Sequence, residues 1–529
     1  MWNNQTARRD FLRISGAGIA AALPYHGAEA QISQAGANSG AHDVKMFGAA
    51  GDGKTIDTPA INRAIEAAAA AGGGTIRFPA GNYLCYSIRL KSNVALCFDQ
   101  NAVIVAADTS GSGGYDPAEP DTAWDAYQDY GHNHWHNSLL WGEGLENISI
   151  YGPGLIWGRG LSRGSGAGPV AENPGVGNKA IALKNCRNVT LRDFSVLKGG
   201  HFCVLATGVD NFTIDNLKID TDRDGIDIDC CRNVRVSNCT VNSPWDDAIC
   251  PKSSFALGYA RATENVTITN CYVTGKYQLG TLLDGTFKRF DAGADYHFTG
   301  RIKLGTESNG GFKNIAISNC VFEGCQGLAL ETVDGGLLED ISITNITMRE
   351  IVSAPIFMRL GSRMRGPAGV PVGSLRRILI GNIVCSDAEP KFGSILSGIP
   401  GHPIEDVQIS DVYIQHRGGG TAEAAAIQPP EVENKYPEPN MFGSMPSQGF
   451  YLRHVKNISV SNVEISSLAE DLRPAFVLDD AEGADFFRVR TPRMKDVPTF
   501  ALKNVADFSA RFCKRVKDTQ IDHVEKARL

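Results

Sequence analysis

The chain lacks several features that would point to common classes of protein. It has no long basic run and carries a net charge of −7 at pH 7, so nucleic acid is not an expected partner. Beyond the N-terminal region no run of about eighteen apolar residues occurs, so we expect a mature protein that does not enter a membrane. The 13 cysteines are odd in number and include no C-x-x-C pair, which predicts few disulfides and no thiolate metal site.

What is present suits an exported globular protein. Apolar residues make up 43% of the 529 residues, and 58 glycines favour many short strands and turns. The N-terminus reads TARRDFLRISGAGIAAALP, which resembles a twin-arginine export signal through Arg8 and Arg9 and the weakly apolar run behind them. Ala28-Glu29-Ala30 is a candidate cleavage site. We therefore expect residues 1–30 to be a signal peptide and the protein to be periplasmic or secreted.

A short pattern with Asn or Asp at both ends and two apolar positions between them returns along the chain. The closest copies start 22 to 26 residues apart, which is the length of one strand plus turns in a solenoid. Asn tolerates left-handed turns, and stacked coils would align these residues into a ladder. We predict an all-β, right-handed parallel β-helix. The copies are NVTLRD (188–193), NFTIDN (211–216), NVRVSN (233–238), NVTITN (265–270), NIAISN (314–319), DISITN (340–345), DVQISD (406–411) and NISVSN (457–462).

The section before the repeats predicts one helix, about Thr58 to Ala71. Asp57 or Thr58 can cap it, Pro59 suits its first turn, and a glycine run follows Ala71. Such a helix would cover the open apolar end of the coil stack. We expect one catalytic β-helix domain over residues 42–510 and a charged tail over residues 511–529.

The stretch DTDRDGIDID (220–229) begins like an EF-hand calcium loop. Counted from Asp220, position 8 is Asp227 and position 12 is Cys231, where an EF-hand needs an apolar residue and a Glu. The flanking residues alternate with period two, which indicates strands. The carboxylates therefore need another explanation; for Asp220, Asp222 and Asp229 we expect turn capping.

Two segments resemble family 28 glycoside hydrolases, the polygalacturonase-like β-helix enzymes: FGAAGDGKTIDTPAINRAIEAAAAAGGGTIRFPAG (47–81) and TDRDGIDIDCCRNVRVSNCTVNSPWDDAICPKSS (221–254). The second is similar to the family's N-T-D-G-I-D-I and D-D-x-I-x-x-K-S segments. The resemblance implies that Asp224, Asp246 and Asp247 are catalytic and that Lys252 binds substrate. It also implies hydrolysis with inversion, with Asp246 as the general acid and the other two aspartates activating water.

The residues themselves fit this chemistry. Asp224 and Asp246 are 22 residues apart, about one coil, so we expect them to stack on neighbouring coils. Inverting hydrolysis needs two carboxyl groups roughly 6.5–9.5 Å apart with a water between them. Three crowded carboxylates also raise at least one pKa, which keeps one acid protonated.

Two features of the family are missing. FTGRIK (298–303) has no His where a Gly-His-Gly segment is expected, and GLALET (327–332) has Ala329 and Glu331 where the family's R-I-K segment binds the substrate carboxylate. Arg301 and Lys303 could supply the missing cations. If they do not, the sugar at the cleavage point is neutral, such as rhamnose, or is bound differently, because Glu331 in place of a Lys would repel a uronate carboxylate. The alternative is that Glu331 is a solvated turn residue.

HNHWHN (132–137) lies among aromatic residues. It could be a carbohydrate-facing loop, in which His134 and Trp135 bind substrate, or an ordinary packed segment. A third reading makes His132, His134 and His136 metal ligands on one strand face.

The leading hypothesis is a monomeric, exported hydrolase of pectin-type polysaccharide that needs no cofactor or metal. The alternatives are a calcium-dependent polysaccharide lyase on the same scaffold and a β-helix that binds glycans without cleaving them. Insertions around residues 105–140 and 277–300 could close one end of the substrate site and favour the removal of terminal sugars.

Overall fold

The structure is a computed structural model, and it describes residues 41–109, 113–129, 131–164, 172–294 and 296–529. The expected signal peptide, residues 1–30, lies outside the described residues. Residues Gly40–Leu529 form one compact unit. Among the described helices, none has the length and apolar character needed to cross a membrane.

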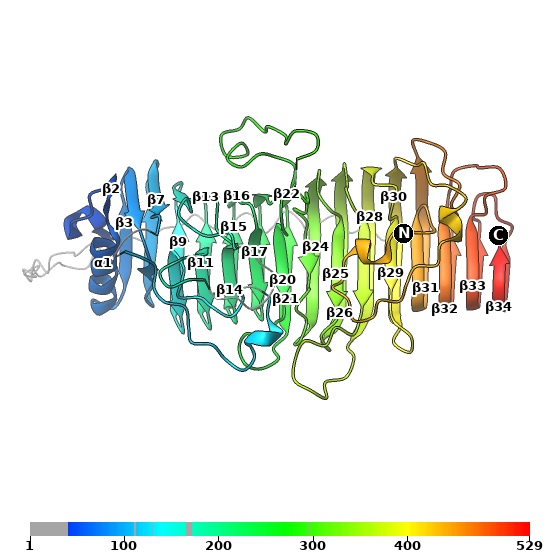
Figure 1. Ribbon diagram of the computed structural model, residues 1–529, viewed down its shortest axis with the longest axis horizontal. Coiled ribbons are helices and arrows are strands. Elements are labelled where there is room, and N and C mark those ends of the chain that lie inside the picture. The colour runs from blue at the N-terminus through cyan, green and yellow to red at the C-terminus, as the bar shows by residue number, and fades with distance from the viewer. Residues whose placement is uncertain (1–40, 110–112, 130, 165–171, 295) are drawn as a thin grey trace, which may run out of the picture. The chain divides into compact units, whose positions relative to one another are not determined.

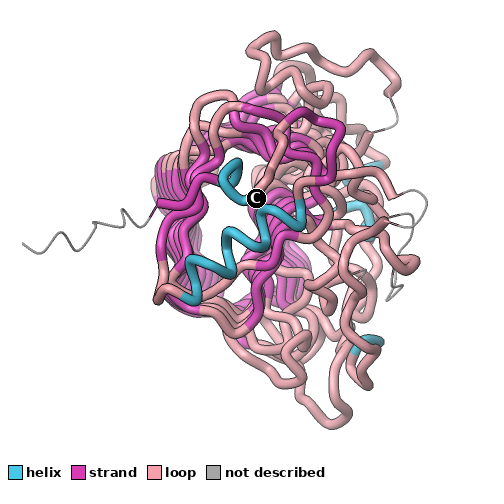
Figure 2. Tube along the Cα trace, turned by 90° about the vertical axis from the view of Figure 1, so that its left-hand side faces the viewer, coloured by secondary structure: helices cyan, strands magenta, loops and turns pink. Residues whose placement is uncertain are grey.

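An N-terminal cap precedes the coils. It contains β1 (Ala41–Asp43), the 3-10 helix η1 (Val44–Phe47) and the predicted helix, α1 (Thr58–Ala70). Figure 2, viewed from the N-terminal end of the coils, shows α1 lying across the opening of the first coil. Its apolar face, which includes Ile61 and Ile65, is buried against the core. The carboxylate of Asp57 does not cap α1 but accepts hydrogen bonds from the backbone N–H groups of Ala50 and Gly51.

One face of the stack is a parallel six-stranded sheet that carries the predicted catalytic residues. Along it, Ile181, Val204, Ile226 and Ile249 point into the core in one continuous row. The alternate positions point outward. The six strands are β5 (Ile88–Arg89), β8 (Leu140–Glu143), β11 (Lys179–Lys184), β14 (Phe202–Thr207), β17 (Asp224–Asp229) and β20 (Ile249–Lys252).

The remaining faces of the first coils are short parallel strands that pair coil to coil (Figure 1). They are β2 (Asp52–Ile56), β3 (Gly74–Phe78), β4 (Gly81–Cys85), β6 (Val94–Phe98), β7 (Ala102–Ala106), β9 (Glu146–Tyr151), β10 (Leu155–Trp157), β12 (Arg187–Arg192), β13 (Ser195–Leu197), β15 (Asp210–Asp215), β16 (Lys218–Asp220), β18 (Arg232–Ser237), β19 (Thr240–Asn242), β21 (Thr263–Thr269) and β22 (Tyr272–Thr274).

In the later coils, single longer strands replace pairs of short ones. The longer strands are β24 (Phe312–Glu323), β26 (Leu337–Arg349), β28 (Ser374–Ala388), β30 (Ile404–His416), β31 (Phe450–Ser467), β32 (Phe476–Phe487), β33 (Phe500–Arg511) and β34 (Thr519–Arg528). Up to β30 they alternate along the chain with the short strands β23 (Lys303–Leu304), β25 (Leu328–Thr332), β27 (Ile356–Leu360) and β29 (Ser394–Ser397). The right-handed parallel β-helix with an N-terminal helix is confirmed. Residues 511–529, predicted as a charged tail, include β34, which pairs antiparallel with β33.

The predicted asparagine ladder is present. Asn188, Asn211, Asn233 and Asn265 have φ between 53° and 58°, the left-handed region. The side-chain amide of each donates to the amide oxygen of the Asn on the preceding coil, for example from Asn211 to Asn188 at 3.0 Å and from Asn265 to Asn233 at 3.2 Å. The repeated Asn thus makes the turn and also links one coil to the next.

The cysteines also follow the prediction. All 13 are free thiols, and none is joined in a disulfide. Cys239, Cys271 and Cys320, which occupy equivalent places in the repeat, are at most 2% exposed and lie in the main apolar core. They act as small apolar side chains inside the coils.

The connections between strands gather on one side of the stack in Figure 2. They include the two long connections predicted as insertions. In Figure 1 the connection after β22 forms the green loop that projects beyond the strands. The connection between β7 and β8 carries the 3-10 helix η2 (Asp125–Tyr127), and the one between β30 and β31 carries η3 (Ala424–Ala426) and η4 (Pro439–Phe442).

Candidate active site

The three predicted catalytic aspartates meet on the six-stranded face. Asp224 begins β17, and the strand register pairs Ile226 with Ile249, an offset of 23 residues. Asp247 therefore lies beside Asp224, and the backbone N–H of Gly225 donates to the Asp247 carbonyl at 2.9 Å. One oxygen from each of Asp224, Asp246 and Asp247 lies within 4.8 Å of the other two.

The contact distance between the nearest oxygens is not the separation of the carboxyl groups that distinguishes inversion from retention. The nearest oxygens are at most 4.8 Å apart, whereas carboxyl groups of inverting glycosidases are roughly 6.5–9.5 Å apart and those of retaining enzymes about 5–5.5 Å. The spacing by itself therefore does not select inversion, which rests on the resemblance alone.

Asp247 is held as a carboxylate by two buried cations. Arg301 Nε lies 2.8 Å from one oxygen and Lys303 Nζ 3.1 Å from the other. Burial would raise the pKa of Asp247, but Lys303 and Arg301 outweigh it and hold the pKa well below its usual range. Asp247 is therefore ionised at neutral pH.

Asp224 has the opposite character. Burial, together with the charges of Asp227 and Asp246, raises its pKa well above the usual range. Its neighbour Asp227 points outward from β17, is fully buried, and has its pKa raised to about 6 mainly by burial. Lys252 Nζ lies 3.3 Å from Asp227 and 3.9 Å from Asp224, so it neutralises this pair.

A histidine enters the cluster from a connection far away in the sequence. His132 Nδ1 lies 3.2 Å from Glu307, and one His132 nitrogen lies within 4.8 Å of oxygens of Asp224 and Asp227. Burial opposes ionisation of Glu307, but His132 and Lys252 contribute to holding its pKa well below the usual range. Sequence reasoning did not assign His132, Asp227 or Glu307 to the site.

The two cations expected to bind a substrate carboxylate are already engaged by the protein. Arg301 is 1% exposed and contacts Glu438 as well as Asp247. Lys303 is 3% exposed and donates to the Tyr436 hydroxyl at 3.3 Å. The expectation that Arg301 and Lys303 bind the substrate carboxylate stays a prediction; in this structure the guanidinium and the ammonium group are both buried against carboxylates of the chain itself.

Glu331 lies one coil beyond Lys303 and is fully buried. Its carboxylate is 4.0 Å from Lys303 Nζ and accepts a hydrogen bond from Thr306 at 3.3 Å. Burial raises its pKa to about 8 despite Lys303 and Arg301. At neutral pH Glu331 is therefore a neutral acid, and it does not repel a uronate in the way the sequence suggested.

The HNHWHN segment forms turns rather than a strand, so its histidines do not share one face. Trp135 is 2% exposed, packs against Ala182, Phe202 and Leu205, and donates to the Thr207 hydroxyl at 3.1 Å. This burial does not fit the expectation that Trp135 stacks on a sugar. His134 is 5% exposed, and burial lowers its pKa.

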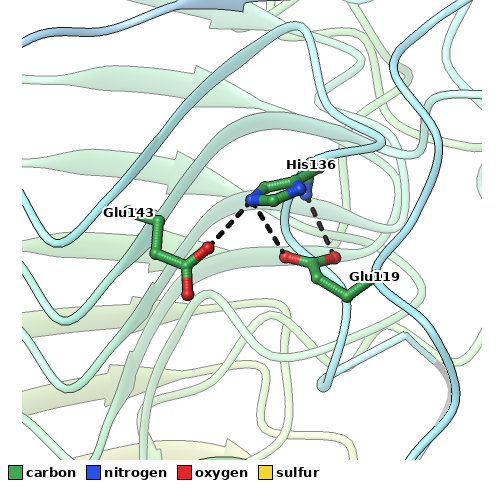
Figure 3. A group of neighbouring side chains, drawn as sticks. All are labelled: Glu119, His136 and Glu143. Atoms are coloured by element: carbon green, nitrogen blue, oxygen red, sulfur yellow. Dashed lines mark hydrogen bonds and ion pairs between the residues drawn. The ribbon is translucent and has the colours of Figure 1, made fainter.

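His136 is held between two carboxylates (Figure 3). Its Nε2 lies 2.9 Å from Glu143 and 3.5 Å from Glu119, and its ring lies against Trp141 with centroids 3.9 Å apart. Glu119 also accepts the backbone N–H groups of Trp135 and His136. This cluster fastens the Trp135 segment to the sheet.

Two of the remaining aspartates have the predicted turn role. Asp220 accepts hydrogen bonds from Asn242 and from the backbone N–H groups of Gly280 and Leu282, which anchors the connection after β22. Asp229 accepts from the backbone N–H and hydroxyl of Ser254.

Comparisons with known proteins agree with the fold and with the resemblance. A family described as "Rhamnogalacturonase A/epimerase, pectate lyase-like" matches residues 41–188, and one described as "Right handed beta helix region" matches residues 179–345. A probable polygalacturonase of Vitis vinifera is 24% identical over 404 residues, which are 71% of this chain and 74% of that protein.

One similar solved structure and one shorter sequence match were also found. The family 28 exopolygalacturonase of Yersinia enterocolitica superposes with a TM-score of 0.57 at 18% identity, over 88% of this chain and 78% of that one. Alginate lyase 7 of Azotobacter vinelandii is 50% identical, but only over 66 residues, 12% of this chain and 8% of that protein. The chain therefore has the fold of a right-handed parallel β-helix. In sequence it is similar to a polygalacturonase over most of its length, although the two differ at most positions.

Proposed function

We propose that this protein is a glycoside hydrolase that removes terminal sugars from pectin-type chains. The observation that carries the proposal is the aspartate cluster: three carboxyl groups lie in mutual contact range, burial and Asp227 raise the pKa of Asp224 well above its usual range, and Lys303 and Arg301 hold the pKa of Asp247 well below its usual range despite burial. Hydrolysis needs an acid at the leaving oxygen and a base at the attacking water, and neighbouring carboxyl groups in unlike environments can supply both.

Asp246 is the general acid in this proposal. Its side chain is 26% exposed, so it can reach the glycosidic oxygen of an entering chain. In its protonated form, Asp246 gives its proton to that oxygen as the bond between the oxygen and the anomeric carbon breaks. A water oxygen then bonds to the carbon and gives its proton to the Asp247 carboxylate, and Asp224 orients the water. Inversion follows if the water attacks from the face opposite the leaving group.

The connections on both sides of the cluster support action at chain ends. Asp227 continues an outward row with Ala182 and Leu205, and Trp135 covers that row on the N-terminal side. On the C-terminal side, Tyr436 and Glu438 cover Lys303 and Arg301. A long polysaccharide could not lie along the six-stranded face past both obstructions.

The test is an incubation of purified protein with pectic oligosaccharides, followed by mass spectrometry. We expect products shorter by one terminal sugar, each with a new reducing end, and proton NMR should show the inverted anomer first. Binding without new reducing ends would instead support a glycan-binding protein.

A calcium-dependent lyase is the second candidate, since the matched family description includes pectate lyase-like proteins. The residues do not fit a calcium ion well. Among the described residues, the aspartate cluster has ligand spacing, but Arg301 and Lys303 lie 2.8 and 3.1 Å from Asp247. The fully buried group of His132, Asp224 and Asp227 has the Lys252 ammonium 3.3 Å from Asp227, where a cation would have to displace it. A lyase product would carry a carbon–carbon double bond with ultraviolet absorbance, which a hydrolase product lacks.

We also propose export through the twin-arginine route. Support comes from the RRDFLR sequence, and this route carries folded proteins, which suits a chain whose 13 cysteines are free thiols.

A further inference from the structure

Two arginines border the catalytic cluster beside Asp246. Arg223 Nη2 lies 3.0 Å from the Asp246 carboxylate, and Arg163 Nε lies 2.8 Å from the Asp222 carboxylate. Arg223 takes the place of the Thr in the N-T-D segment that Asp222–Asp224 resembles. We call Arg163, Asp222, Arg223 and Trp245 the arginine rim.

Aromatic contacts fix the orientation of the outer arginine. The Arg163 guanidinium carbon lies 4.9 Å from the centre of the Trp245 ring, and Trp245 stacks on His297 with ring centroids 4.3 Å apart. The Trp245 backbone N–H donates to the Asp222 carbonyl at 3.0 Å, which joins the ring to the same turn. A guanidinium that is already held against an indole ring and a carboxylate loses little freedom when it binds an anion.

The rim keeps hydrogen-bond donors that the protein does not use. Arg163 is 47% exposed; its Nε contacts Asp222, and its two terminal nitrogens have no hydrogen-bond partner among the described residues. Arg223 is 22% exposed, and its Nη2 contacts Asp246 at 3.0 Å and His201 Nε2 at 3.3 Å. Two parallel N–H groups at one guanidinium match the two oxygens of a carboxylate.

We propose that the arginine rim is a binding subsite for the carboxylate of a hexuronate on the leaving side of the cleaved bond. This rests on the proposed function, in which Asp246 protonates the leaving oxygen, because the leaving sugar must then lie next to Arg223. Arg163 binds the carboxylate through its terminal nitrogens, and Arg223 contributes from the side of Asp246.

The other charged residues of the cluster explain why an acidic sugar would bind at the arginine rim and not in the buried interior of the site. Arg301 and Lys303 are buried against Asp247, Glu438 and Tyr436, and Glu331 is a neutral acid, so the interior presents no free cation to a uronate. A neutral sugar in the interior and a hexuronate at the rim together define an oligosaccharide of the type found in rhamnogalacturonan.

The experiment measures binding by calorimetry to the full chain carrying Asp224→Asn, so that the readout does not depend on turnover. The probes are a disaccharide of rhamnose linked to galacturonic acid and the methyl ester of the same disaccharide. We expect the acid to bind about tenfold more tightly than the ester, the size of one charge-assisted pair at a partly exposed site. Added Arg163→Gln should remove this preference and leave the ester affinity unchanged.

Arg192→Gln is the matched control, because Arg192 also lies over an aromatic ring, Tyr151, but on another sheet. It should keep the preference for the acid. Equal binding of acid and ester, no binding of either probe, or a preference that survives Arg163→Gln would overturn the subsite. A preference that depends on Arg163, combined with no cleavage of the acid probe by the parent, would uphold the subsite and refute the proposed hydrolysis.

Discussion

The protonation state of Glu331 can be determined from the way the free energy of unfolding changes with pH. Burial raises its pKa to about 8, from an ordinary value of 4.5. A carboxyl with a higher pKa in the folded state takes up a proton on folding, so its contribution to stability is fully present below pH 4.5 and is lost as the pH rises towards 8. Each pH unit in that window costs about 1.4 kcal/mol, so the loss reaches about 3 kcal/mol at pH 7.

The perturbation is Glu331→Gln, which keeps the shape of the neutral acid and removes its titration. The free energy of unfolding of the variant minus that of the parent should rise by about 3 kcal/mol between pH 4.5 and pH 7. Urea unfolding followed by tryptophan fluorescence at several pH values gives this difference, and pH effects common to both proteins cancel.

Glu339→Gln is the control with the opposite sign. Burial would raise the pKa of Glu339, but its hydrogen bonds to Arg376 and Arg377 lower it, so that its contribution is lost as the pH falls. The free energy of unfolding of Glu339→Gln minus that of the parent should therefore change with pH only in the acid range. A Glu331 difference that stays flat or falls between pH 4.5 and 7 would show that Glu331 is ionised and paired with Lys303, and the reasoning would be refuted.

The same charge state changes what Glu331 does to substrates. While protonated it does not repel a uronate, but above pH 8 it is ionised and does. Cleavage of polygalacturonate relative to a substrate with a neutral terminal sugar should therefore fall as the pH passes 8 in the parent and stay constant in Glu331→Gln. Glu331→Lys is a poorer probe, because it would bury a second ammonium beside Lys303.

Three further outcomes are expected. Asp246→Asn should lower hydrolysis by about 10²–10⁴-fold with little change in the unfolding midpoint, and activity within a few-fold of the parent would remove Asp246 as the acid. EDTA should leave activity unchanged, whereas a complete loss restored by calcium would favour the lyase. A reporter fused to residues 1–30 should reach the periplasm through the twin-arginine route, and export that persists after Arg8→Lys and Arg9→Lys would contradict the signal.

The fold was predictable because its information is local and repeated. Each coil has its own Asn at the turn and its own pair of inward apolar residues, so a single copy such as NFTIDN already shows the pattern that the neighbouring coils share. The clustering of Asp224, Asp246 and Asp247 was predictable for a related reason. They lie on two successive coils of the repeat, and a short motif marks each of them.

The charges around the aspartates could not be predicted in that way. Arg301 and Lys303 looked like free cations because their partners, Glu438 and Tyr436, stand more than 130 residues later in a connection with no repeat pattern. His132 likewise reaches Glu307 across 175 residues of chain. The protonation of Glu331 could not be predicted either, because it results from burial, which raises the pKa of that carboxyl group.

The division between what the coils determine and what the connections determine has a consequence for substrate choice. The coils place Asp224, Asp246 and Asp247 on a face that any polygalacturonase-like β-helix could share. The connections determine which charged side chains on that face have no partner. One connection supplies Glu438, which pairs with Arg301, and two others place Arg163 and His297 against the Trp245 ring. Substrate preference in this scaffold can therefore change through residues far from the catalytic motifs, while the reaction itself stays with the aspartates.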